Sequence, residues 1–143
     1  MAEREKTGKM STFGGPNDKG VKPDENLALY AAQKSTKLAP DPKLFLHDQP
    51  ESTSGTARRL NPESFYLAMR WKEGTDYAHL RSIKIKVRNT QTRKSAEAYA
   101  VDFGPGKATG RVADLSPGLA KYLGVETDDD VTVTLPEGIY LRD

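Results

Sequence analysis

Cysteine is absent from the 143-residue chain. Its absence excludes disulfides, thiolate nucleophiles and thiolate metal ligands. Histidine is scarce as well, because only His47 and His79 occur and they lie far apart in the sequence. Neither a zinc site of ordinary ligand spacing nor a Ser-His-Asp triad is therefore expected. We expect no metal and no other cofactor.

Long apolar runs are also missing. The charged segment 1–10 is not followed by the apolar core of a secretory signal, and no stretch approaches membrane-spanning length. The charge is nearly balanced, with 22 lysines and arginines against 20 aspartates and glutamates. This balance does not favour a nucleic-acid binder or a polybasic membrane binder. The sequence predicts a soluble chain and leaves a cell-wall, secreted or phage-associated location open.

The length is that of one domain. Only 36% of the residues are hydrophobic, and nine prolines and twelve glycines are present, so part of the chain is expected outside the core. We predict a disordered lead over residues 1–9 and a single domain over 10–143. Residues 31–62 are rich in Lys, Pro, Ser, Thr and Asp, which predicts a long surface insertion packed loosely over the domain.

Short strands dominate the predicted secondary structure. Ser82–Val87 alternates most clearly between apolar and basic residues, as a half-buried strand does. In Ala96–Phe103 the same period of two places Asp102 on one face with Ala98 and Ala100. The other predicted strands are Met10–Phe13, Phe65–Trp71, Gly110–Leu115 and Val131–Leu135.

One helix is clearly delimited. Ser116 is a favourable N-cap, Pro117 suits the first helical position, and Gly124 ends the helix. Several short strands with so little helix favour a small closed or nearly closed β-barrel, because closure leaves no exposed strand edge.

Two motifs resemble a known family. Val101-Asp102-Phe103-Gly104-Pro105 followed by Thr109–Gly124 resembles the Asp-x-Gly-Pro … Gly-Arg-x-x-Asp-Leu-Ser … Leu-Gly signature of the rare lipoprotein A family. Upstream, Ser11–Asp18 is similar to the Thr-x-Tyr-Gly opening of that family's barrel. The resemblance implies a mainly β fold: the six-stranded double-psi β-barrel shared with expansins, with one or two short helices and a long surface insertion.

The resemblance also implies two carboxylates in an open groove. Asp102 matches the first family aspartate, and Asp114 matches the general acid of the lytic transglycosylase relatives. Glycosidic cleavage needs a carboxylic acid that protonates the leaving oxygen, and burial or a neighbouring carboxylate must raise its pKa. Purely structural roles remain open, because Asp114 can satisfy backbone donors at a strand-to-helix turn and Asp102 can cap a turn.

Five further residues are candidate substrate ligands. Thr12, Phe13 and Asp18 belong to the upstream motif. Tyr66 and Trp71 offer aromatic faces of the kind that pack against a pyranose, although such residues are more often part of a core; Phe65 and Tyr77 are weighed in the same way. The basic stretch 81–94 is interpreted as a solvated strand face, with attraction to an anionic polymer as the alternative.

The sequence thus predicts a glycan-active or glycan-binding domain that acts on peptidoglycan or a related polysaccharide. If it is an enzyme, we expect a lytic transglycosylase or a glycoside hydrolase working through Asp114. The alternative is a non-catalytic binding or structural module of a phage particle or a secreted assembly. Two departures from the family pattern, Phe13 where expansins have Tyr and Asp24-Glu25 where several members have Gly-Glu, leave binding without cleavage open.

Overall fold

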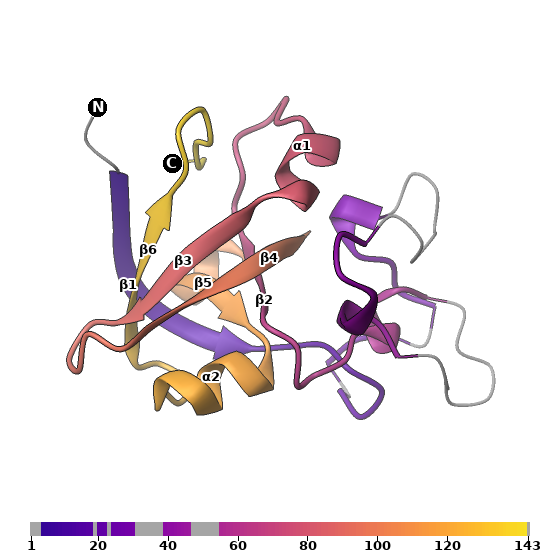
Figure 1. Cartoon of the computed structure of the whole chain (residues 1–143), viewed down its shortest axis with the longest axis horizontal. Helices are drawn as coiled ribbons and strands as arrows, with labels where there is room; N and C mark the ends of the chain where they lie inside the picture. Colours follow the sequence, from indigo (N-terminus) through magenta and orange to yellow (C-terminus); the bar gives the residue numbers. More distant parts are fainter. Residues whose placement is uncertain (1–3, 19, 23, 31–38, 47–54, 143) are drawn as a thin grey trace.

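Six strands form a closed barrel in the order β1-β5-β2-β4-β3-β6 (Figure 1). The computed structural model describes residues 4–18, 20–22, 24–30, 39–46 and 55–142. The strands are β1 Arg4–Thr12, β2 Tyr66–Met69, β3 Lys84–Asn89, β4 Ser95–Phe103, β5 Arg111–Leu115 and β6 Asp130–Leu135. β1 runs parallel to β5 and β2 parallel to β4, whereas the other neighbours are antiparallel. The predicted mainly β fold class with a closed six-stranded barrel is confirmed, and each of the two parallel pairs joins strands that are not consecutive in the sequence.

Two short α-helices flank the barrel, α1 Tyr77–Ser82 and α2 Pro117–Leu123. α2 begins and ends as predicted, with Ser116 Oγ accepting a hydrogen bond from the Leu119 amide and Gly124 in the left-handed conformation. α1 was not predicted from the sequence. Within the described ranges, no helix combines the length and hydropathy of a membrane-crossing segment. Short 3₁₀ turns are η1 Ala28–Tyr30, η3 Pro42–Leu44, η4 Ala57–Arg59 and η5 Lys107–Thr109.

β1 begins at Arg4, so the prediction of a disordered lead is wrong for residues 4–9. These residues pair with β6 from Arg4–Leu135 to Lys9–Asp130, and the following residues pair with β5. The segment consists of polar residues and one glycine, so it shows no hydrophobic alternation. Backbone pairing with β6 forms this part of the strand without that pattern.

The described parts of the predicted insertion contribute to the core. Leu44, Phe45 and Leu60 are buried, and Phe45 and Leu60 form a β-bridge. The Phe45 ring also meets Tyr30 edge-to-face, with the ring centroids 5.2 Å apart. These parts therefore pack tightly, contrary to the prediction of a loose loop, while residues 31–38 and 47–54 lie outside the described residues.

Candidate functional site

Asp102 and Asp114 lie on one face of the sheet, on either side of Ala68. Ala68 pairs with Asp102 across β2–β4 and with Asp114 across β2–β5. Residues in register on neighbouring strands project to the same face. That face is the outer one, because the adjacent Leu67 and Leu115 belong to the core. Two strand spacings place the two aspartate Cα atoms about 10 Å apart.

A β-bulge in β4 places Asp102 on this outer face. Ala100 pairs with Leu67 and Asp102 with Ala68, so β4 contains one residue, Val101, more than β2 supplies. Strict alternation, as predicted from the sequence, would turn Asp102 inward with Ala100, where burying a charge is costly. Ala100 and Val101 are instead both buried, and Asp102 turns outward.

β5 contains a second bulge, two residues before Asp114. The β5 partners of Lys9 and Met10 are two residues apart, which leaves Val112 as the extra residue. Gly8 provides the space for it, since a Cβ atom at that position would lie 2.5 Å from Val112 Cγ1. Bulges often occur beside active sites, where they redirect a side chain. Each aspartate thus lies one or two residues after a β-bulge in its own strand.

The Asp102 carboxylate is tied to the backbone. Its Oδ1 accepts hydrogen bonds from the amides of Ala28 and Phe103, each at 2.8 Å. The Trp71 indole nitrogen donates to the Asp102 carbonyl at 2.9 Å. Burial raises the pKa of Asp102 to about 6, although the two amide bonds oppose the increase. Asp102 therefore fastens η1 to the end of β4.

Asp114 is held differently. It is half-buried, and none of the described residues donates a hydrogen bond to its carboxylate. Burial raises the pKa of Asp114 to about 6; the positive charge of Arg111 opposes the increase, and the negative charges of Asp102 and Asp18 add to it. At the strand-to-helix turn the hydroxyl of Ser116 accepts the backbone donors. Asp114 therefore has no capping role there.

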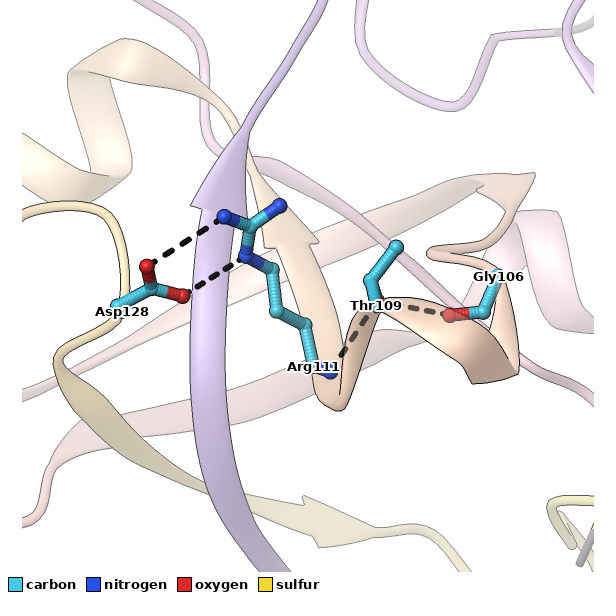
Figure 2. A network of polar contacts seen from close by, with 4 residues as sticks. All are labelled: Gly106, Thr109, Arg111 and Asp128. Atoms are coloured by element: carbon cyan, nitrogen blue, oxygen red, sulfur yellow. Dashed lines mark hydrogen bonds and ion pairs between the residues drawn. The ribbon is translucent and has the colours of Figure 1, made fainter.

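Arg111 is oriented by Asp128 (Figure 2). Its Nε lies 2.9 Å from Asp128 Oδ1, and its Nη2 lies 3.4 Å from Oδ2. The Arg111 amide donates to Thr109 Oγ1 at 3.1 Å, and that hydroxyl donates to the Gly106 carbonyl at 2.7 Å. This two-point pairing holds the guanidinium where its positive charge limits the increase in the pKa of Asp114. Arg111 was not among the site residues predicted from the sequence, although it lies inside the downstream signature.

The upstream motif forms a hollow of about 350 Å³. Thr12, Phe13 and Asp18 line it together with three prolines, two glycines and an asparagine. Asp18 Oδ2 accepts a hydrogen bond from the Gly14 amide at 2.6 Å, which fixes the loop. Thr12 pairs with Leu115, the residue after Asp114, across β1–β5, which places the hollow next to Asp114. The structure thus brings these three predicted residues together.

Tyr66 and Trp71 differ from the expectation for substrate ligands. Both are fully buried and offer no ring face to a sugar. The Tyr66 hydroxyl donates to the Phe13 carbonyl at 2.8 Å, and the Trp71 indole bonds the Asp102 backbone. Their contacts with neighbouring strands and loops decide this burial, and a local sequence pattern does not contain that information. Both side chains thus hydrogen-bond the backbone of predicted site residues.

Comparison with known proteins adds no assignment. No protein-family model matches the chain, and no curated protein matches it. In the described part of the chain, no group of three or more His, Asp or Glu side chains is placed to hold a metal ion. The likeness to the rare lipoprotein A family thus rests on the two motifs and stays a prediction.

Proposed function

We propose that the barrel binds and cleaves a glycan of the peptidoglycan type, with Asp114 as the general acid. The observation that carries this proposal is the state of the Asp114 carboxyl group. It is half-buried, accepts no hydrogen bond from the described residues, and has a pKa raised to about 6. About half of such groups retain a proton at pH 6, so the acid is available to protonate a leaving glycosidic oxygen.

Asp102 supports a different role in the same reaction. Its Oδ1 is committed to two backbone amides, so its carboxylate stands fixed on the outer face beside Ala68. A fixed negative charge stabilises the positive charge that develops on the sugar ring during cleavage. In lytic transglycosylase relatives the substrate's own hydroxyl is the nucleophile, so one acid is sufficient and Asp102 need not attack the sugar.

The test compares two isosteric substitutions. Asp114→Asn removes the titratable proton, whereas Asp130→Asn makes the same change at an exposed aspartate. With purified peptidoglycan and with cellulose, products are measured by mass spectrometry and binding by pull-down. We expect Asp114→Asn to lower product release at least about a hundredfold with unchanged binding and melting temperature, and Asp130→Asn to have no effect.

The pH profile provides a second readout of the same proposal. The general acid must be protonated, so cleavage should decrease as the pH rises above the Asp114 pKa of about 6. Undiminished cleavage by Asp114→Asn, or a rate that increases steadily from pH 5 to pH 8, contradicts the role of Asp114.

A non-catalytic glycan-binding module is the second candidate. The hollow lined by Thr12, Phe13 and Asp18 favours it, because this concave surface needs no proton transfer to hold a ligand. Retention of either polysaccharide without release of products would support this candidate over the enzyme. Failure to retain any polysaccharide would contradict both functions.

A further inference from the structure

A second surface covers the outer face of β3 and β4. One hollow of about 600 Å³ lies between these strands, the start of β1, the end of β6 and residues 136–140. Another of about 410 Å³ lies between the strands and residues 41–44 and 61–65. Lys84 and Glu97 line both hollows, which therefore adjoin and form one trough, the β3–β4 groove. Neither Asp102 nor Asp114 lines it.

The floor of the β3–β4 groove presents charged groups that are free to bind a ligand. Lys86 is directly opposite Glu97 in the strand register, and Lys84 is opposite Tyr99. No ion pair or hydrogen bond within the described residues uses the side chains of Lys86, Glu97 or Glu137. The Lys84 ammonium lies 5.7 Å from the centroid of the Tyr99 ring. Amine donors and carboxylate acceptors thus lie side by side.

Aromatic rings are present at both ends of the groove. Tyr140 lines the larger hollow and is 50% exposed. The Arg4 guanidinium lies 4.1 Å from the centroid of the Tyr140 ring, which holds this exposed side chain in place. Tyr99 and Phe65 line the smaller hollow and are partly buried. Fixed rings of this kind supply apolar contact area at little cost in conformational entropy.

The balance of charge narrows the choice of ligand. The lining contains the cations Arg4, Lys43, Lys84 and Lys86 and the anions Asp41, Glu63, Glu97 and Glu137. Such a mixture does not favour a polyanion such as nucleic acid. The closed barrel also has no free strand edge on which an extended peptide can add a strand.

We propose that the β3–β4 groove binds an uncharged glycan chain, with sugar rings packed on Tyr140 and Tyr99 and hydroxyl groups bonded to Lys84 and Glu97. Polyhydroxylated rings have the apolar faces and the paired donors and acceptors that this lining complements. The inference shares its ligand class with the proposed function but none of its residues, so it does not depend on cleavage by Asp114.

The test titrates ¹⁵N-labelled protein with two probes, cellohexaose and the β-1,4 hexamer of N-acetylglucosamine. We expect amide shifts in β3, β4 and residues 136–140 with at least one probe. Tyr140→Ala should weaken that binding at least about tenfold, because a stacking ring is lost. Tyr140→Phe, which keeps the ring, should bind like the parent, and Asp130→Asn, at an exposed aspartate that does not line the groove, should also bind normally.

Three outcomes would overturn this proposal. The first is that neither hexasaccharide shifts the amide signals of the groove residues. The second is equal weakening by the Ala and Phe variants at Tyr140 when both melt like the parent. The third is stronger groove binding of polyphosphate that disappears at high salt. Cleavage is measured separately. Binding in the groove without release of products would therefore contradict only the catalytic role of Asp114.

Discussion

At the residue scale, two aspartates with similarly raised pKa values differ in their hydrogen bonding. Asp102 gives its Oδ1 to two backbone amides, whereas Asp114 accepts no hydrogen bond from the described residues. Burial raises the pKa of each to about 6. Hydrogen bonding, and not the direction of the pKa shift, therefore distinguishes Asp102 from the proposed general acid Asp114.

Two substitutions at Asp102 separate its charge from its hydrogen bonds. Asp102→Asn keeps a carbonyl oxygen that can accept from the amides of Ala28 and Phe103, so stability should change little. Asp102→Ala leaves the part-buried Ala28 amide without its partner. This loss should lower the free energy of unfolding by about 1–3 kcal/mol, as measured by urea denaturation. Equal losses in both variants would show that the charge of Asp102 matters more than its contacts.

The sequence located the residues whose signal is local. Asp102, Asp114 and the Thr12–Asp18 segment belong to short motifs. The structure places the two aspartates on the strands that flank β2, and the segment at the end of β1 and in the loop that follows. The orientation of Arg111 could not be predicted, because its partner Asp128 lies 17 residues further along in a loop. The burial of Trp71 likewise depends on distant contacts, including its bridge to Leu141.

At the element scale, the alternation rule predicted where strands occur but not how they are aligned. The alternation in Ser82–Val87 continues into β3, where Ile85 and Val87 are buried. The rule fails at Val101 and Val112, because a bulge arises from a mismatch in length between two paired strands. One strand read alone does not reveal that mismatch, so the alternation grouped Asp102 with Ala98 and Ala100, which are buried while Asp102 is only partly buried.

The β5 bulge can be tested through its contact with β1. Gly8→Ala places a methyl group 2.5 Å from Val112 Cγ1, and a stiff β-branched side chain has little freedom to yield. We expect a loss of about 1–3 kcal/mol in the free energy of unfolding. Gly106→Ala is the control, since nothing lies within 4 Å of its added carbon and its φ is −62°.

A double variant completes this experiment. Val112→Ala removes the clashing methyl groups. The double variant Gly8→Ala/Val112→Ala should therefore lose less free energy of unfolding than the two single variants lose in sum. Strictly additive losses would mean that Gly8 and Val112 do not touch, and the pairing of β1 with β5 would then need revision.

At the scale of the whole molecule, β1 closes the barrel by pairing with β5 on one side and β6 on the other. A chain that starts at Met10 would lose every β1–β6 pair from Arg4 to Lys9. We expect this truncated chain to lose its cooperative thermal transition, whereas Lys6→Ala, which keeps the backbone, should melt like the parent. Circular dichroism measures both. A truncated chain as stable as the parent would instead favour the prediction of a disordered lead over residues 1–9.

Barrel closure also links the earliest strand to leave the ribosome with the latest. Thr7 and Thr132 share a hydrogen bond across 125 positions. At 5–20 residues per second, β1 waits on the order of ten seconds for its β6 partner to be synthesised. An unpaired apolar strand exposed for that time would invite aggregation. Residues 4–9 are polar, which is why alternation does not predict a strand there. The same polar composition lowers the tendency of the unpaired strand to aggregate with other chains before β6 is synthesised.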